Sequence, residues 1–242
     1  MSILNRGDYR WPKCPEPLTA AQESAREHWM MLWHDEVLGK FSALENFNHG
    51  YVAALGVPPG TRTLEIGAGI GGHIPFENLD VQEYHVLEMR AEFCARLAER
   101  LPPNRVHAGS IEEPQPFAAG SFDRVIAIHV LEHLRNLPAA LAEVRRLLNP
   151  EGFFDVVLPT EGGLGYGLAR KVSSDRMFKK NFGMDYTPII RNEHVNTFDE
   201  VFSLLKRHYH VEVSRYFPLV VPSVDLNLIV AMRLRPLAPR VG

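Results

Sequence analysis

The sequence predicts an α/β protein built on a doubly wound sheet of seven mostly parallel strands, with an antiparallel hairpin strand at one edge. Short apolar segments alternate with segments of helical periodicity, and the predicted strands are apolar on both faces. That pattern is typical of a parallel sheet covered by helices on two sides. A glycine-rich loop directly follows the first predicted strand, as in α/β folds that bind a ligand at the carboxyl ends of their strands.

Composition indicates an ordinary globular protein. Of its 242 residues, 45% are hydrophobic and 23% charged, and the net charge is −3, so we expect no nucleic-acid partner. Cys14 and Cys94 stand alone, which argues against a disulfide framework and a cysteine zinc site. No apolar run is long enough to span a membrane, and the N-terminus lacks the apolar core of a signal peptide. We therefore expect a cytoplasmic monomer or homodimer.

The N-terminal quarter of the chain predicts two helices. Thr19 is a candidate N-cap for the first, and the second is expected over residues 41–55, ending at Gly56. Apolar residues three or four apart define the first helix: Ala25, Trp29, Leu32, Trp33, Val37 and Phe41. We expect residues 1–56 to form a helical segment that covers the functional site, and residues 57–242 to form the main domain.

The main domain alternates strands and helices as far as residue 158. Strands are predicted over 61–66, 83–87, 122–128 and 153–158, with a further strand at Val106; helices are predicted over 73–79, 89–101 and 136–148. Residues 159–195 show no clear period. Thr197 and Glu200 then form a capping box that starts another helix. Two β-rich runs, 210–217 and 225–234, have no helix between them and predict an antiparallel pair at the edge of the sheet.

The glycine loop and two carboxylates are the most informative feature. Leu64–Gly72 reads Leu-Glu-Ile-Gly-Ala-Gly-Ile-Gly-Gly, and glycines here let a ligand approach the backbone closely. Glu65, at the end of the first strand, would suit a cationic ligand better than a pyrophosphate. Glu88 ends the next strand, at a separation where a carboxylate can bind ribose hydroxyls.

Three segments in the expected order resemble a known family. Leu64–Gly72, Val86–Glu88 and Ser121–His133 are similar to the successive cofactor motifs of class I S-adenosylmethionine-dependent methyltransferases, in the branch whose fourth strand ends in His-Val-Leu-Glu-His. The resemblance covers roughly residues 55–158. It implies a Rossmann-like fold, the cofactor S-adenosyl-L-methionine, and methyl transfer to an oxygen or nitrogen atom.

The same resemblance implies a set of cofactor-binding residues. Glu65 and the glycines would border the methionine part, Glu88 the ribose, and Met89 the adenine. The full set is Glu65, Gly67, Ala68, Gly69, Gly71, Glu88, Met89, Ser110, Ile111 and His129. Family members commonly carry Asp where this chain has Ser110, so we expect weaker binding of the adenine amine.

His129-Val-Leu-Glu-His133 also spells the H-x-x-E-H signature of a group of zinc peptidases. That signature requires both imidazoles on one helical face. Here His129 follows a buried strand and Pro138 lies just beyond His133, so no metal is expected. His129 is either a packing residue or a substrate contact and general base. Glu132 and His133 are expected to begin or support the next helix.

Residues 160–196 are expected to form a lid or acceptor site, because long insertions in compact domains are usually functional. The segment resembles the lids of methyltransferases of sugar and surface-polysaccharide biosynthesis, which favours a small anionic or sugar-containing acceptor. Its basic residues are Arg170, Lys171, Arg176, Lys179, Lys180 and Arg191, which otherwise form a solvated helix face. The candidate substrate-binding residues are Tyr166, Arg170, Arg191, Glu193 and Asn196. His194 and Glu161 join His129 as candidate catalytic bases.

Two other functions remain open from the sequence. A nicotinamide-dependent oxidoreductase could use the same glycine loop, and a non-catalytic binding module could retain the fold for recognition of a partner. Titration with S-adenosylhomocysteine and with NAD would separate the first from methyl transfer.

Overall fold

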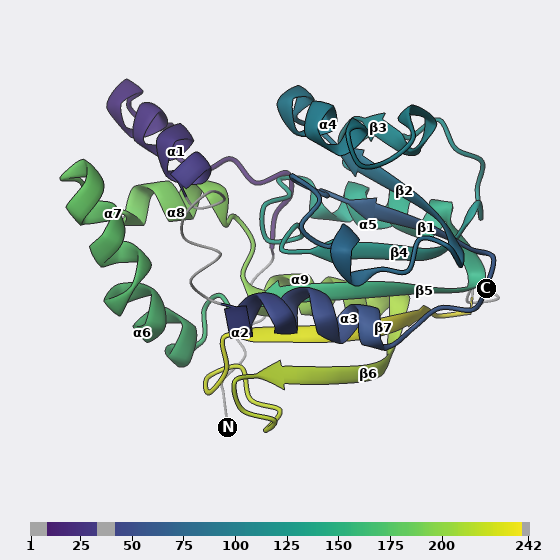
Figure 1. Ribbon diagram of the computed structural model, residues 1–242. Coiled ribbons are helices and arrows are strands. Elements are labelled where there is room, and N and C mark those ends of the chain that lie inside the picture. The colour runs from purple at the N-terminus through teal and green to yellow at the C-terminus, as the bar shows by residue number, and fades with distance from the viewer. Residues whose placement is uncertain (1–8, 33–41, 239–242) are drawn as a thin grey trace.

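The computed structural model describes residues 9–32 and 42–238. The described chain forms a seven-stranded sheet in the order β3-β2-β1-β4-β5-β7-β6, with helices on both faces (Figure 1). This confirms the predicted α/β architecture. The strands are β1 (Thr61–Ile66), β2 (Gln82–Glu88), β3 (Val106–Ala108), β4 (Phe122–Ile128), β5 (Leu148–Pro159), β6 (Tyr209–Phe217) and β7 (Ile229–Pro236).

The predicted antiparallel pair forms, with one difference in position. β7 pairs antiparallel with both β5 and β6 and therefore lies inside the sheet, while β6 forms the edge. Burial explains the order. Residues 229–234 of β7 are all buried, whereas exposed residues alternate with partly buried ones along most of β6. A strand that is apolar on both faces gains more by lying between two neighbours than at an edge.

The helices follow the predicted order, with the first helix beginning as expected at Thr19, whose hydroxyl accepts a hydrogen bond from the backbone of Gln22. Trp33, Val37 and Phe41, assigned to that helix from the sequence, lie outside the described residues. The helical segments are α1 (Ala20–Leu32), α2 (Ser42–Glu45), η3 (Asn46–Gly50), α3 (Tyr51–Ala54), η4 (Ile74–Phe76), α4 (Ala91–Ala98), η5 (Pro103–Arg105), α5 (Leu137–Leu147), α6 (Leu164–Val172), α7 (Ser174–Phe182), α8 (Thr187–Glu193) and α9 (Phe198–His208).

The core has two layers, one on each face of the sheet. Leu137 and Val144 of α5 and Val201 and Leu205 of α9 cover one face, together with apolar residues of the central strands. Val52 of α3 and the apolar residues of α4 cover the other face. The predicted capping box of Thr197 and Glu200 is present at the start of α9.

A charged network lies under α3 on one face of the sheet. Arg124 of β4 is fully buried, and its guanidinium contacts Glu77 at 2.9 Å and Asp155 at 2.7 Å. Asp155 also binds Arg233 of β7 at 2.8 Å. Loss of one partner would leave buried charge uncompensated, so this network ties β4, β5 and β7 together.

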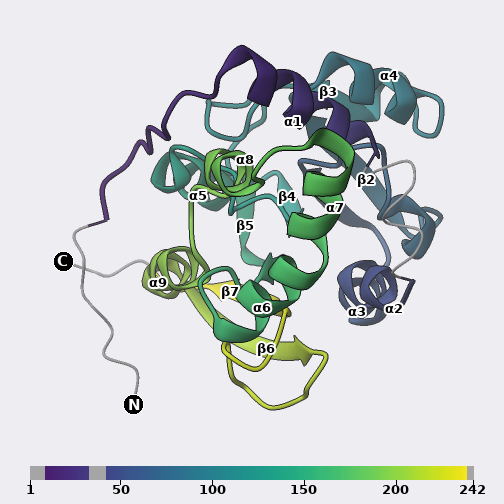
Figure 2. The ribbon, with the colours of Figure 1, turned by 90° about the vertical axis from the view of Figure 1, so that its left-hand side faces the viewer.

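The insertion is helical, although its sequence shows no clear period. α6, α7 and α8 lie with α1 across the carboxyl ends of the strands (Figures 1 and 2). Trp29 of α1 packs edge-on against Phe178 and Tyr186, and its indole donates a hydrogen bond to the Tyr186 hydroxyl at 3.2 Å. The period is weak in the sequence because the helices are short. Phe178 of α7 and Ile189 and Ile190 of α8 are buried in a cluster with α1, far away in the chain, whereas α6 buries none of its residues.

Candidate functional site

The glycine loop follows β1, at the carboxyl end of the parallel strands. The helices α1, α6, α7 and α8, together called the helical lid, lie across that end of the sheet (Figure 2). Gly67, Gly69 and Gly71 have φ angles of +63°, +56° and +81°, a region that residues with a Cβ atom rarely adopt. Backbone conformation alone therefore requires glycine at all three positions.

The space around these glycines differs from what the sequence suggested. A Cβ atom on Gly67 would lie 2.6 Å from the Val130 side chain, and one on Gly71 would lie 2.8 Å from Ile74. A Cβ atom on Gly69 would meet no described atom within 4 Å. Gly67 and Gly71 are thus needed for packing within the protein, and of the three, Gly69 is the one that faces open space.

Glu88 connects the end of β2 to this loop. Its side chain is almost fully buried, and its two carboxylate oxygens accept hydrogen bonds from the backbone N–H groups of Gly69 and Arg90, each at 2.9 Å. The next residue, Met89, has 71% of its surface exposed. A fixed acceptor beside an exposed apolar side chain is an arrangement that suits a ribose and the base attached to it.

Glu65 is buried on β1 and accepts a hydrogen bond from the Tyr84 hydroxyl at 2.8 Å. Burial raises the pKa of this carboxyl to about 8, although the Tyr84 hydrogen bond acts in the opposite direction. Without a ligand, the side chain is therefore largely neutral at pH 7. A neighbouring cation would favour the ionised form and lower that pKa.

The segment after β3 contributes Ser110 and Ile111. Ile111 is buried, as is Ala68 of the glycine loop. The Ser110 hydroxyl accepts a hydrogen bond from the backbone of Glu112 at 3.2 Å, and the Ser110 carbonyl accepts one from Gln115 at 2.7 Å. The hydroxyl can still donate its own hydrogen.

His129 directly follows β4 and has a φ of +53°, and no other non-glycine residue of the described chain has a positive φ. Such strain at a strand end is often associated with function. Its Nδ1 lies 3.3 Å from Glu132, and its Nε2 is buried and has no hydrogen-bond partner among the described residues.

The two other candidate bases are adjacent to each other. His194 Nδ1 lies 2.9 Å from a carboxylate oxygen of Glu161. The Tyr166 hydroxyl also hydrogen-bonds to Glu161. Burial opposes ionisation of Glu161, but the contacts with His194 and Tyr166 outweigh it and lower its pKa. The sequence proposed all three residues without indicating that they form one hydrogen-bonded chain.

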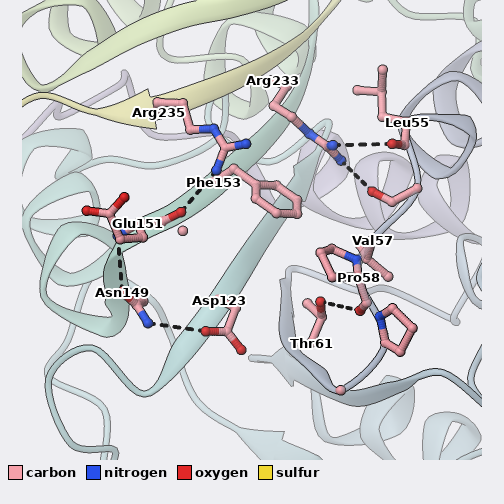
Figure 3. Close-up of a pocket in the computed structure, with 14 residues that line it drawn as sticks. Leu55, Val57, Pro58, Thr61, Asp123, Asn149, Glu151, Phe153, Arg233 and Arg235 are labelled. Carbon is pink, nitrogen blue, oxygen red and sulfur yellow. Dashed lines mark hydrogen bonds between the residues drawn. The ribbon is translucent and has the colours of Figure 1, made fainter.

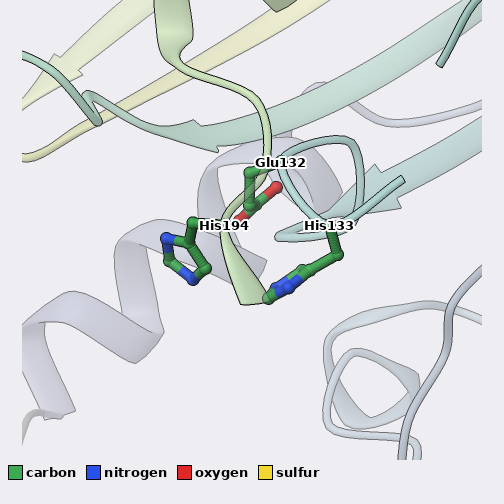
Figure 4. A group of neighbouring side chains, drawn as sticks. All are labelled: Glu132, His133 and His194. Carbon is green, nitrogen blue, oxygen red and sulfur yellow. The ribbon is translucent and has the colours of Figure 1, made fainter. Parts of the chain in front are cut away.

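Glu132 and His133 do not begin the next helix as expected, because α5 starts at Leu137. Glu132 is buried, and His133 stacks edge-on against His194 with ring centroids 4.7 Å apart (Figure 4). From the sequence there was no reason to expect metal binding by these residues, because the His-x-x-Glu-His pattern binds zinc from a helix. The missing partner, His194, lies in the insertion.

The candidate substrate-binding residues have different surroundings. Arg170 lies 3.9 Å from Asp175, and its Nε is buried without a hydrogen-bond partner among the described residues. Glu193 binds Arg26 of α1 at 2.8 Å. Arg191 is exposed. Asn196 is fully buried, and its amide bonds to Trp11, Leu131 and Leu134, so it supports the fold and has no group left for an acceptor.

The basic residues of the insertion mostly face solvent. Exposed side chains belong to Lys171, Arg176, Lys179, Lys180 and Arg191. Arg170 is the exception among them, and its charge acts on Glu161. Acidic residues gather next to the strand ends: Glu132 after β4, and Glu161 and Glu193 of the insertion. The basic composition is thus largely a property of the outer surface of the lid.

A cavity of about 320 Å³ lies between α1 and the start of α4. Arg90 and Glu193 both line it, so it connects the end of β2 with the lid. This cavity lies on the side of the sheet where Glu88 and Met89 would hold a nucleoside.

A second cavity, of about 730 Å³, lies at the opposite end of the parallel strands, where β1 and β4 begin (Figure 3). It is lined by the loop before β1 and by Phe153, with Arg233 and Arg235 beside the ring. Both guanidinium groups are already bound to carboxylates, Asp155 and Glu212. Ligands of parallel sheets bind at the carboxyl ends of the strands, so this cavity is not the candidate active site.

Sequence comparison identifies the central part of the chain. Residues 64–156 match the family described as "Methyltransferase domain". The sterol 24-C-methyltransferase ERG6B of Gibberella zeae is 28% identical over 120 residues, which is 47% of this chain and 32% of that protein. The chain therefore matches about a third of the length of that relative.

Solved structures share the fold across most of the chain. A possible histamine N-methyltransferase of Thermotoga maritima has a TM-score of 0.59 and 16% identity, covering 88% of this chain and 97% of its own. The 1,6-didemethyltoxoflavin-N1-methyltransferase of Burkholderia thailandensis, solved with S-adenosylhomocysteine, has a TM-score of 0.56 and 21% identity, covering 93% and 94%. Together with the matched domain and the strand order, these similarities support a class I S-adenosylmethionine-dependent methyltransferase: residues 64–156 match a methyltransferase domain, and the described chain shares the fold of such enzymes.

Proposed function

We propose that this protein transfers a methyl group from S-adenosyl-L-methionine to an oxygen or nitrogen atom of a small polar acceptor that binds beneath the helical lid. The observation that carries this proposal is the hydrogen bond between the loop after β1 and the end of β2. There the Glu88 carboxylate holds the N–H of Gly69, the one loop glycine with open space in front of it. A nucleoside lying over Gly69 would place its ribose hydroxyls beside Glu88 and its base beside Met89.

The charged end of the cofactor is proposed to lie near Glu65. In the free protein, burial keeps this carboxyl largely protonated. A sulfonium or ammonium group beside it would favour the ionised carboxylate. The nicotinamide alternative loses support, because the matched family and the strand order are those of methyltransferases. We propose Ser110, Ile111 and His129 as the remaining walls of the cofactor site.

The acceptor is proposed to bind between the end of β4 and the insertion. Arg170 has a buried Nε that makes no hydrogen bond among the described residues and lies 3.9 Å from Asp175, so it can donate a hydrogen bond to an oxygen of a sugar or an anionic group. Glu161, Tyr166 and His194 form a hydrogen-bonded chain at the same end of the sheet. Proximity of acceptor and cofactor would supply most of the rate acceleration.

The experiment is a calorimetric titration of the purified protein with S-adenosylhomocysteine, and in parallel with NAD. We expect one binding site for the first compound and none for the second. Transfer of labelled methyl groups is then measured with panels of sugar, carboxylate, phosphate and sterol acceptors. Well-folded protein that ignores S-adenosylhomocysteine would reject the proposal. Uptake of the cofactor without transfer to any acceptor in a cell extract would favour a non-catalytic binding module.

A further inference from the structure

Three side chains with metal-binding atoms converge where the lid meets the sheet. Glu132 and His133 follow β4, and His194 follows α8, some 60 residues later. Each offers one potential ligand atom, and these atoms lie within 4.8 Å of one another. In Figure 4 the three side chains point toward a common space from three directions.

The outer hydrogen bonds of both histidines fix which ring nitrogen can bind a ligand. His133 Nδ1 lies 3.0 Å from the backbone carbonyl oxygen of Glu193, which can only accept, so this nitrogen carries the hydrogen. His194 Nδ1 lies 2.9 Å from the Glu161 carboxylate, which also accepts. The Nε2 atoms therefore keep their lone pairs, since the hydrogen bonds of the two rings to described residues run through Nδ1. Histidines that bind metals almost always have such an outer acceptor on the second ring nitrogen.

Glu132 provides an independent observation. Its side chain is only 2% exposed, and its Oε2 has no hydrogen-bond partner among residues 9–32 and 42–238. A buried carboxylate oxygen without a partner is costly. His129, whose Nδ1 lies 3.3 Å from the other oxygen, leaves Oε2 free to bind a cation.

We propose that Glu132, His133 and His194 bind one divalent transition-metal ion. Two imidazole nitrogens and one carboxylate leave coordination positions open, as in catalytic zinc sites and in iron(II) oxygenases. This donor set suits Zn²⁺, Mn²⁺, Fe²⁺ or Co²⁺, and is a poor one for Mg²⁺, which prefers oxygen ligands. The His-Val-Leu-Glu-His segment thus supplies metal ligands without the helical geometry in which that pattern is usually found.

The role of the ion rests on the proposed methyl transfer, whereas its binding does not. An acceptor hydroxyl in an open coordination position becomes more acidic and loses its proton to solvent water. The acceptor oxygen then forms a bond to the cofactor methyl carbon. The carbon–sulfur bond breaks with its electron pair on sulfur, which leaves S-adenosylhomocysteine. The acidic inner part of the lid, and the outward position of most of its basic residues, agree with a cation at this point.

The first test measures metal binding directly. Chelator-treated protein is titrated with Zn²⁺, Mn²⁺ and Co²⁺ by calorimetry, and the Co²⁺ complex is examined by visible absorption. We expect one ion per chain and Co²⁺ bands typical of nitrogen and oxygen ligands. The ion also joins the lid to the sheet, so it should raise the unfolding temperature. Failure of the wild-type protein to take up one equivalent of any of these ions at 100 μM or so overturns the proposal.

Variants locate the ion. His133→Ala, His194→Ala and Glu132→Gln each remove a ligand and should weaken binding by at least about 100-fold, whereas Glu161→Gln removes only an outer acceptor and should weaken it by about 10- to 100-fold. His210→Ala, an exposed histidine of β6, is the matched control and should bind as the wild type does. Wild-type metal affinity in both His133→Ala and His194→Ala also overturns the proposal.

The affinity for S-adenosylhomocysteine separates the two proposals. All of these variants should keep it, which shows that they fold. If the wild type binds S-adenosylhomocysteine but no metal, only the metal site is wrong; if it binds metal but no S-adenosylhomocysteine, the proposed function fails. His133→Ala also distinguishes a metal from a histidine base, because a His194–Glu161 base would not need His133. Methyl transfer that survives both chelation and His133→Ala overturns the role of the ion.

Discussion

The Gly69→Ala substitution tests whether Gly69 is needed for cofactor binding or only for its backbone conformation. Gly69 has a φ of +56°, and a Cβ atom there would meet no described atom within 4 Å. The cost to folding should therefore be the strain of an L-residue at positive φ, about 1–2 kcal/mol. If the cofactor lies over Gly69, the added methyl group also occupies ligand space. Overpacking costs about 1–3 kcal/mol, so affinity should fall by about 5- to 150-fold.

Gly60 provides a matched control, because it directly precedes β1 and so lies at the other end of that strand. It has a φ of +83°, and its Cβ atom would also meet nothing within 4 Å. Urea denaturation should show similar destabilisation of Gly60→Ala and Gly69→Ala. Calorimetry with S-adenosylhomocysteine should show weaker binding for Gly69→Ala alone. Equal affinity in the two variants would refute the placement of the cofactor over the glycine loop.

Three further predictions follow from buried charges. Glu88→Gln removes a charged acceptor whose hydrogen bonds are worth about 1.5–3 kcal/mol, so S-adenosylhomocysteine affinity measured by calorimetry should fall by about 10- to 100-fold; an unchanged value would contradict ribose binding by Glu88. Protonated Glu65 stabilises the fold fully below pH 4.5, and this stabilisation is lost as pH rises toward its folded pKa of about 8. A cationic cofactor favours the ionised form, so S-adenosylmethionine affinity should rise between pH 6 and 8 in the wild type, and a similar rise in Glu65→Gln would exclude Glu65 as the cause. Arg124→Met leaves Glu77 and Asp155 buried without their cation and should cost about 3–5 kcal/mol in urea denaturation. Arg62→Met, at a side chain 34% exposed, should cost no more than about 1 kcal/mol. Equal losses of unfolding free energy in the two variants would show that the buried ion pairs of Arg124 stabilise the fold no more than an exposed pair does.

Local sequence patterns predicted most of the sheet and the cofactor loop. β1 and β4 begin and end where their apolar runs do, at Thr61–Ile66 and Phe122–Ile128. The Thr197–Glu200 capping box also formed as predicted. These features depend on residues close together in the chain, so their signal is complete within a short window.

Contacts between distant segments could not be predicted in this way. The apolar residues of α7 and α8 have a clear partner only when α1 packs against them, which brings Trp29 to Phe178 and Tyr186. The position of β7 between β5 and β6 was another such feature. Burial of a strand on both faces depends on the assembled sheet and not on the local sequence.

The residue types and their spacing alone predicted the resemblance to methyltransferases, the glycine loop, and the carboxylates near the ends of β1 and β2, because these signals are local. The tertiary structure decided which loop glycine faces open space and which charges of the insertion point outward. It also brought Glu132 and His133 to His194, so that a pattern dismissed for lack of a helix becomes part of a three-residue cluster. Spacing along the chain constrains only residues that are close in sequence. The distance between residues far apart in sequence is set by the tertiary fold.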